Sequence, residues 1–383
     1  MKVLITNPDA LLDPTTGVFY PGLKDVLDRF NEKVDQGTIV ISMDPMKLHD
    51  IPKEYVPLHV NRLQRAGTNL IEFIKKNLQC EISEIYILGC KKVDVLLAKN
   101  SKLLLLRADY TNGLFESELI FEKGYGISIK DSNRLEQFLQ KFTRISQPWY
   151  FKCEVSDRTT LYSLTNANTF HRASEITELS GKFRECLKHG DDSYREEFLL
   201  YFLVSTYAII NELQGVDVWT VYPSSTGIPN PELEYFKDKA RQSLSNSRKT
   251  DPLFIRTKPT SKRQSLTKEL RLKNGCDHEL ETLIVNPKYG NLTGKVICII
   301  DDFTTYGTSC ETARILLENA GVKKIVFLTL GKYGRDHYRY NYTFKGDPYK
   351  SFAFSNEGYL KTNGTFNTNS DMAFLESLKE IVR

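Results

Sequence analysis

The sequence has no hydrophobic run long enough to cross a membrane, no large excess of one charge and no paired-cysteine motif. Its longest apolar stretch, 198–210, is interrupted by Ser205 and Thr206 and falls short of the ~18 to 20 residues of a membrane helix. We interpret this stretch as a buried helix and expect no membrane association. The 52 Lys and Arg residues against 48 Asp and Glu leave a formal charge of +4. That charge is too small to predict a nucleic-acid or membrane surface for the whole molecule.

Cysteines are few, and their number favours free thiols over a disulfide scaffold. The chain has seven, with no Cys-x-x-Cys pair. An odd count fits free thiols in a reducing compartment, and the spacing of cysteines and histidines predicts no zinc site. The first residues include Asn7, Pro8 and Asp9, so they do not form the apolar core of a secretory signal. We therefore predict a cytoplasmic protein.

The length of 383 residues predicts two domains. Strand-like apolar runs alternate with helical patterns in two series, which is typical of parallel α/β sheets. The sequence therefore predicts an α/β protein with two doubly wound parallel-sheet domains joined by a helical segment. The predicted domains are 1–145 and 146–383, the second with a helical lead-in at about 146–214 and a Tyr/Asn-rich C-terminal extension at about 334–383.

The most informative stretch is 296–322, in which an apolar strand ends in two acids, a Thr/Gly/Ser loop and a helix. Backbone N–H groups of a tight loop and of a helix N-terminus bind phosphate, and Gly307 lets the backbone approach closely. The two acids, Asp301 and Asp302, would repel a phosphate unless hydroxyl groups or a metal used their oxygens. A ribose supplies such hydroxyls, so the stretch predicts a site for a phosphorylated sugar.

This stretch resembles the motif that binds phosphoribosyl diphosphate (PRPP) in type I phosphoribosyltransferases. The resemblance implies that Asp301 and Asp302 contact the ribose hydroxyls. Residues 216–227 resemble the first strand and diphosphate loop of that fold, and 253–275 resemble a segment of its ComF-type branch. Tyr306 departs from the family, which has a small residue there. The ligand-binding residues implied are Thr304, Thr305, Tyr306, Gly307, Thr308, Ser309, Ser224, Ser225, Thr226, Lys262, Arg263 and Arg271.

Local charge supports an anion site in the same half of the chain. The segment 237–273 holds twelve basic and three acidic residues, and we expect it to lie beside the leaving diphosphate. A solvated face or a nucleic-acid surface is the alternative interpretation. Lys262, Arg263 and Arg271 are candidates for a mobile loop that closes on the diphosphate.

The resemblance implies transfer of phosphoribosyl from PRPP to a nucleobase-like or amine acceptor, with release of diphosphate. Mg²⁺ would be held mainly by the substrate, with no metal site of the protein's own. Two alternatives stay open. One is a non-catalytic module that senses a nucleotide or PRPP and regulates a protein partner or a homodimer. The other is a component of a bacterial stress or phage-defence system that binds nucleic acid.

The first series of elements resembles haloacid-dehalogenase (HAD) hydrolases in its strand–turn–helix motifs. The resemblance implies an acid at each of several strand ends, but Asn7 and Cys90 stand in two of these places. An Asn side chain cannot form an aspartyl-phosphate. The domain is therefore expected to have a HAD-like fold without phosphatase activity, or to be an unrelated α/β domain. The degenerate site consists of Asn7, Asp9, Ser42, Cys90 and Asp94.

The C-terminal extension alternates aromatic residues at strand spacing. Tyr338, Tyr340 and Tyr342 would share one face of a strand. We interpret this segment as a cover over the site or an interface. The alternative is a platform on which an acceptor base stacks.

Overall fold

The computed structural model describes residues 1–111, 119–144, 149–168, 174–244, 251–259, 267–368 and 378. The chain divides into two compact units. Unit 1 comprises Met1–Ser146, Glu196–Asn211 and Lys239–Asn246, and unit 2 comprises Gln147–Arg195, Glu212–Asp238 and Ser247–Arg383. In the described parts of the chain, no helix is long and apolar enough to cross a membrane.

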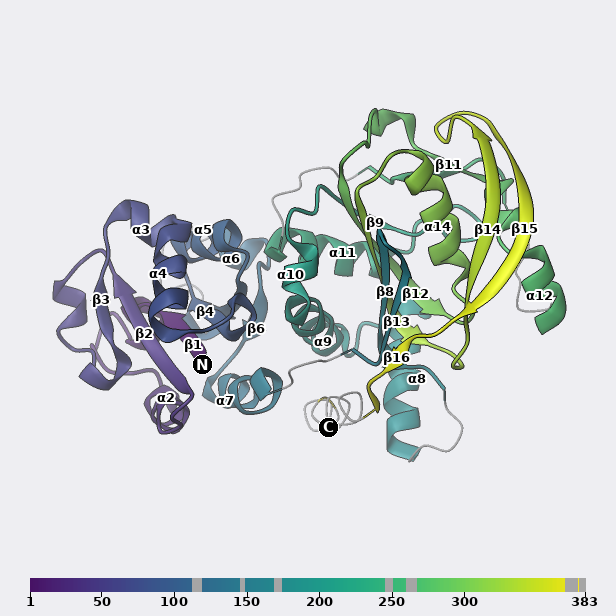
Figure 1. The fold of residues 1–383 in the computed structure, drawn as a ribbon. Helices are drawn as coiled ribbons and strands as arrows, with labels where there is room; N and C mark the ends of the chain where they lie inside the picture. The colour runs from purple at the N-terminus through teal and green to yellow at the C-terminus, as the bar shows by residue number, and fades with distance from the viewer. Residues whose placement is uncertain are drawn as a thin grey trace. The chain divides into compact units, whose positions relative to one another are not determined.

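Unit 1 is built on a six-stranded parallel sheet in the order β3-β2-β1-β4-β5-β6 (Figure 1). The prediction of a parallel α/β sheet is therefore confirmed for this unit. The strand order reverses between β1 and β4, and ligands of doubly wound folds bind at such a reversal, beyond the carboxyl ends of the strands. The strands are β1 (Lys2–Thr6), β2 (Gln36–Ser42), β3 (Pro57–His59), β4 (Ile85–Gly89), β5 (Leu104–Ala108) and β6 (Ile127–Ile129).

Helices cover both faces of this sheet. In Figure 1, α2 and α7 lie together on one side, and α3, α4 and α5 group on the other. The helices are α1 (Pro8–Leu11), α2 (Leu23–Asn31), α3 (Arg62–Ala66), α4 (Thr68–Leu78), α5 (Lys92–Ser101), α6 (Leu119–Glu122) and α7 (Ser132–Lys141). The short 3-10 turns are η1 (Met46–Leu48), η2 (Lys53–Tyr55), η3 (Ile82–Glu84), η4 (Asp109–Thr111) and η5 (Phe142–Arg144).

Helix α9 (Arg195–Ala208) lies mostly in unit 1, and the side chains of residues 198–207 are all buried. This confirms the buried helix expected from the apolar stretch. The hydroxyl of Tyr207 lies within hydrogen-bond distance of the backbone carbonyls of Ile82 and Ile85, the latter at 2.7 Å, and donates its one hydrogen between them. The helix thus belongs to the core of a unit that begins far upstream in the sequence.

Unit 2 has a mixed sheet in the order β16-β7-β8-β13-β12-β9, which corrects the expectation of a second all-parallel sheet. Strands β8, β13, β12 and β9 are parallel, whereas β7 and β16 run antiparallel to their neighbours. The tight turn at 157–158 joins β7 to β8 as a hairpin within the segment expected to be helical. The strands are β7 (Phe151–Ser156), β8 (Thr159–Asn166), β9 (Val218–Val221), β12 (Val296–Thr304), β13 (Lys324–Lys332) and β16 (Thr365–Phe366).

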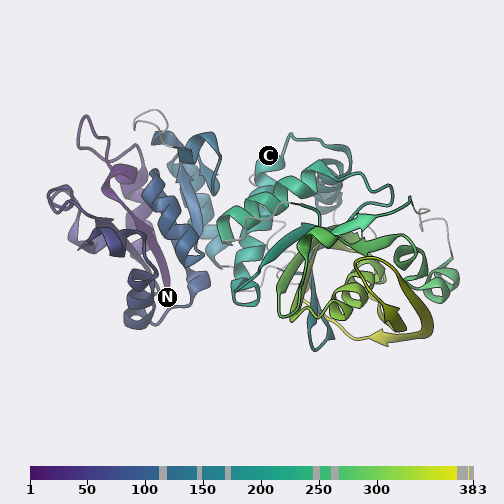
Figure 2. The same cartoon turned by 90° about the horizontal axis from the view of Figure 1, so that it is seen from above.

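Two further pairs of strands lie outside this sheet. One is β10 (Phe254–Arg256) with β11 (Leu283–Val285), and the other is the hairpin of β14 (His337–Gly346) and β15 (Phe352–Thr362). The hairpin curves beside α14 (Figure 2). The remaining elements of the second half are α8 (Ser174–His189), α10 (Ile210–Leu213), α11 (Pro231–Leu244), α12 (Lys268–Asn274), α13 (Asp277–Leu280), α14 (Thr308–Asn319) and η7 (Pro287–Tyr289).

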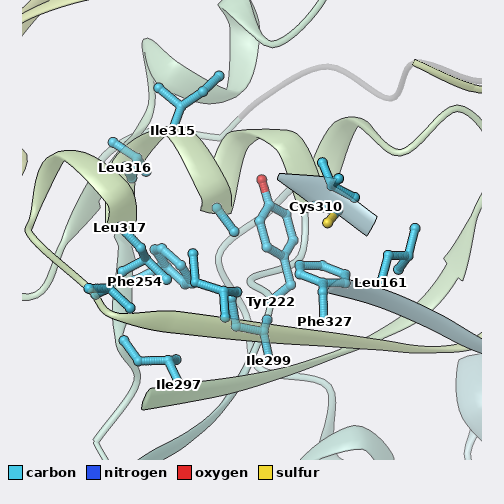
Figure 3. Packing of buried hydrophobic residues seen from close by; sticks show 14 of the residues in the cluster. Leu161, Tyr222, Phe254, Ile297, Ile299, Cys310, Ile315, Leu316, Leu317 and Phe327 are labelled. Atoms are coloured by element: carbon cyan, nitrogen blue, oxygen red, sulfur yellow. The ribbon is translucent and has the colours of Figure 1, made fainter. Parts of the chain in front are cut away.

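The core of unit 2 lies between α14 and one face of the mixed sheet (Figure 3). Ile297 and Ile299 of β12 point toward α14, as alternate residues of a strand must. Phe327 of β13 and Leu161 of β8 extend the same apolar layer. This packing fixes the carboxyl end of β12 against the first turn of α14, where the predicted site lies.

Candidate functional site

The loop between β12 and α14 brings together the acid pair and the start of the helix. β12 ends at Thr304, and α14 begins at Thr308. Gly307 between them has φ 88°, a left-handed conformation that favours glycine. The sequence-predicted residues 304–309 therefore form one tight turn, with Asp301 and Asp302 directly before it.

The backbone of this loop directs its carbonyl groups inward. The carbonyls of Thr304 and Tyr306 accept hydrogen bonds from the amides of Tyr333 (2.8 Å) and Tyr338 (3.1 Å), and that of Thr305 accepts one from Lys332 Nζ. The amides of residues 306–309 donate no hydrogen bond within the described parts of the chain. Four consecutive N–H groups without an acceptor are the kind of donor set that binds anions in proteins.

The carboxylates of Asp301 and Asp302 contact different groups. Asp301 lies on the α14 side, where its carboxylate accepts a hydrogen bond from Ser309. Burial, with the charge of Asp302, raises the pKa of Asp301 well above its usual value. Asp302 points the other way, and its Oδ2 lies 3.0 Å from Lys188 Nζ of α8. The same ammonium group lies 5.5 Å from the ring centroid of Phe303.

A second loop follows β9 at the same edge of the sheet. Val221 pairs with Ile300 in parallel register, so the residues after β9 begin beside the acid pair. Arg256 holds this loop: its Nε donates to the Ser224 carbonyl at 2.7 Å and its Nη2 donates to Glu279 at 2.7 Å. The hydroxyls of Ser224 and Thr226 lie 3.1 Å apart within the loop. The structure therefore brings the predicted loop 224–226 and the predicted loop 304–309 to one sheet edge.

Tyr306 packs away from the acid pair. Its ring contacts Tyr338 at 5.7 Å between centroids, and the Arg271 guanidinium lies over it at 4.8 Å. Lys268 approaches the same ring at 5.7 Å. The bulky side chain therefore joins the loop 304–309 to α12 and to the β14–β15 hairpin. Of the three cations expected to close on the diphosphate, Arg271 lies next to this loop, whereas Lys262 and Arg263 lie outside the described residues.

The described cations of the basic segment 237–273 are divided between the two units and between buried and exposed positions. Lys239 belongs to unit 1, where it donates to the Gly124 carbonyl. Lys237 is buried and paired with Glu234, and Arg256 is buried under the loop after β9. These three cations thus contribute to the packing of their own surroundings.

Tyr338, Tyr340 and Tyr342 share one face of β14, as predicted, but that face is turned inward. Tyr338 and Tyr340 are buried in the unit 2 core, and Tyr342 packs against it. The Tyr342 hydroxyl accepts a hydrogen bond from the Cys276 amide at 2.8 Å. The segment after residue 334 is thus a hairpin that packs on the core, and these rings are not an open stacking platform.

In unit 1 the predicted residues gather at the carboxyl edge of the sheet, between β1 and β4. Asn7 Nδ2 donates to Asp94 Oδ2 at 3.0 Å, and the amides of Cys90 and Lys91 donate to the same oxygen at 3.0 and 2.9 Å. The other oxygen of Asp94 pairs with Arg65, which sequence reasoning missed. Burial raises the pKa of the Cys90 thiol. Ser42 is also buried at this edge, and its hydroxyl accepts from the Asp44 amide at 3.0 Å.

The two carboxylates of this site already carry cationic partners. Asp9 lies 2.7 Å from Lys47 Nζ and 2.6 Å from Lys91 Nζ. Burial alone would raise the pKa of Asp9, but these two ammonium groups lower it. Because Arg65 pairs with Asp94 and two lysines pair with Asp9, neither acid is available to a divalent cation. The residues present therefore do not fit a Mg²⁺ ion.

Comparison with known proteins gives no relative: no protein-family description matches the chain, and no curated protein matches it.

Proposed function

We propose that unit 2 is a phosphoribosyltransferase-like domain that binds PRPP with Mg²⁺ at the carboxyl edge of its sheet. The observation that carries the proposal is the loop after β12, where the amides of residues 306–309 lack acceptors in the described structure and Asp301 and Asp302 precede them. These amides suit a 5′-phosphate, and the two carboxylates suit the ribose hydroxyls. The loop at 224–226 suits the diphosphate.

The chemistry that follows is displacement at ribose C1 by a nucleobase-like or amine acceptor, with departure of diphosphate. The two loops hold the ligand at both ends and so fix C1 between acceptor and leaving group, and no protein nucleophile is needed. Mg²⁺ supplies charge neutralisation on the diphosphate. Among the described residues, no group of three or more His, Cys, Asp or Glu gathers to hold an ion. We assign the ion to the diphosphate, whose oxygens are ligands that Mg²⁺ prefers.

A second candidate is a non-catalytic domain that binds the same ligand and regulates a protein partner or a second copy of the chain. The contact between Lys188 and Asp302 favours it, because an ammonium group and ribose hydroxyls compete for one carboxylate. In this candidate, ligand binding displaces Lys188 and frees the last turn of α8.

Calorimetric titration with PRPP and Mg²⁺, followed by an assay for released diphosphate, tests the proposal. Binding with release in the presence of nucleobases supports transfer, binding without release supports sensing, and absence of binding rejects both. The double variant Asp301→Asn, Asp302→Asn should lose binding and keep its circular dichroism spectrum. Asp157→Asn, in the exposed turn between β7 and β8, is the control.

The variant Lys188→Met separates sensing from transfer further. If the ammonium group competes with the ribose, its removal should tighten PRPP binding severalfold, since an exposed ion pair is worth up to about 1 kcal/mol. The matched control is Lys182→Met on the same helix, which removes the exposed pair with Glu178. Weaker binding by Lys188→Met alone would instead make Lys188 part of the ligand site.

For unit 1 we propose a HAD-like domain without phosphatase activity. Asn7 in place of the nucleophile and the cations on Asp9 and Asp94 support this. Incubation with p-nitrophenyl phosphate and Mg²⁺ should give no hydrolysis. Hydrolysis that disappears in Asn7→Ala would contradict the proposal.

A further inference from the structure

Lys332 lies directly behind the loop that the proposed function assigns to the 5′-phosphate. It is the last residue of β13 and is fully buried. Its ammonium group donates to the backbone carbonyls of Thr305, Tyr333 (3.1 Å) and Asp336 (2.8 Å). One buried cation therefore joins the phosphate loop to the turn that leads into β14.

The hydrogen bond to Thr305 determines where the next amide points. In a planar trans peptide the C=O and the following N–H point in opposite directions. With the Thr305 carbonyl held inward by Lys332, the Tyr306 N–H is turned outward, to the side of the free amides of residues 307–309. Lys332 thereby orients the first donor of the anion site without touching the ligand.

His337 fills the space on the inner side of the same loop. A Cβ atom on Gly307 would lie 2.0 Å from His337 Cε1, so the imidazole lies against the Gly307 backbone. The ring is fully buried, and neither ring nitrogen has a partner within the described structure. Lys332 thus holds the loop, and the uncharged His337 ring supports it from the inner side. The side of the loop that carries the free amides faces the ligand.

We infer that Lys332 is a positioning residue for the 5′-phosphate, holding the phosphate loop in its binding conformation through the Thr305 carbonyl. This inference rests on the proposed function and adds to it. Loss of Lys332 should therefore change the affinity for the two ends of the ligand differently. Binding of a sugar phosphate should weaken, whereas binding of diphosphate at the loop after β9, which Arg256 holds, should not.

The charge of Lys332 provides a second readout. Burial lowers the pKa of Lys332 to about 8. The titratable groups that face it are Asp336, Cys153 and His337; their pKa values are about 2, about 11 and about 3, so none of the three titrates between pH 7 and 9.5. A bound phosphate dianion favours the protonated lysine. Affinity should therefore fall as pH rises above 8, with proton uptake on binding.

The experiment titrates the full-length protein with ribose 5-phosphate and, separately, with Mg²⁺–diphosphate, at pH values from 7 to 9.5. The phosphate group of the sugar, with a pKa near 6, stays fully ionised in this range. We expect wild-type affinity for ribose 5-phosphate to decrease severalfold with rising pH. Lys332→Met should weaken ribose 5-phosphate binding at pH 7 about five- to tenfold, the effect of one or two lost hydrogen bonds, and should remove the pH dependence.

Lys324→Met is the matched control, because Lys324 lies at the other end of the same strand, in an ion pair with Glu212. Equal ribose 5-phosphate affinity in wild type and Lys332→Met would overturn the inference and leave the proposed function intact. A wild-type affinity that does not change with pH would also overturn it, and this measurement needs no variant to fold. Failure of wild type to bind either probe would overturn the proposed function itself.

Discussion

Asp301 is a carboxyl group whose surroundings oppose its ionisation. It is half-buried between β12 and α14 and stands next to Asp302, and both effects raise its pKa. A group with a raised pKa in the folded state costs stability at every pH above its unfolded pKa, because folding then requires proton uptake or burial of charge. Asp301 therefore lowers the stability of the folded protein. The proposed contact with the ribose hydroxyls would explain why an acid is present there.

Asp301→Asn should therefore stabilise the protein at pH 7 while abolishing PRPP binding. The amide has the size of the carboxyl group and carries no charge to bury. Thermal unfolding of wild type and variant at pH 4 and pH 7 checks this: the difference in Tm should be larger at pH 7. The control is Asp157→Asn, an exposed aspartate. Destabilisation by Asp301→Asn at pH 7 would show that the carboxylate is stabilised in the free protein.

Arg65 and Asp94 form an ion pair inside unit 1, with side chains that are 5% and 2% exposed. Removal of one partner of a buried pair leaves an uncompensated charge and costs about 3 to 5 kcal/mol. Arg65→Met should lower the free energy of unfolding by that amount in urea titration. Lys24→Met, which breaks an exposed pair with Asp28, should cost at most about 1 kcal/mol. Equal small effects would mean that Asp94 is held by its backbone hydrogen bonds alone.

At the scale of elements, the phosphate loop and the β14–β15 hairpin form one assembly. Gly307 lies on His337, Tyr306 contacts Tyr338, and Arg314 of α14 donates to the Tyr340 carbonyl at 2.7 Å. The hairpin comes late in the sequence, yet it supports the loop that begins α14. Changes on either side of this contact should therefore be coupled.

Gly307→Ala tests the coupling. The substitution adds a Cβ at a left-handed position, which costs about 1 to 2 kcal/mol, and that Cβ would overlap the His337 ring. In a double-mutant cycle with His337→Ala, part of the cost should be recovered. Gly334→Ala, at φ +65° with no atom within 4 Å of the added Cβ, should show the conformational cost alone. Additive effects of the two substitutions would contradict the contact.

For the whole molecule, each unit carries a tyrosine that ties distant segments of its own fold. The Tyr207 hydroxyl hydrogen-bonds to the backbone of unit 1 at Ile82 and Ile85, and the Tyr222 hydroxyl donates to Glu279 of unit 2 at 3.0 Å. Compact units with separate cores open separately when destabilised. The same chemical change in each unit should therefore have a local effect.

Tyr207→Phe should raise hydrogen exchange in β1 and β4 and leave β12 and β13 unchanged, and Tyr222→Phe should do the reverse. Each variant is the matched control of the other, because both remove one hydroxyl. Exchange measured by mass spectrometry on the full chain resolves these segments. A rise across both units in either variant would show that the chain unfolds as one cooperative unit.

Features set by neighbouring residues could be predicted from the sequence. The strand, acid pair, loop and helix of 296–319 are contiguous, and their conformations follow from an apolar run, a glycine and a helical pattern. The parallel sheet of unit 1 followed from regular alternation of strands and helices. The strand β14 was expected from its alternating tyrosines, whereas its pairing with β15 and the β7–β8 hairpin were missed, because strand pairing depends on residues that lie elsewhere in the sequence.

The side chains that complete the two sites were decided by the tertiary structure alone. Four cations join elements that are separate in sequence. Lys188 pairs with Asp302, Arg65 pairs with Asp94, Arg256 holds the loop after β9, and Lys332 holds the loop after β12. Nothing in the local pattern of a lysine or arginine shows which distant carbonyl or carboxylate it reaches. The charge of segment 237–273 was visible in the sequence, but folding distributes its described cations over two units, because Lys239–Asn246 belongs to unit 1 and the rest of the segment to unit 2.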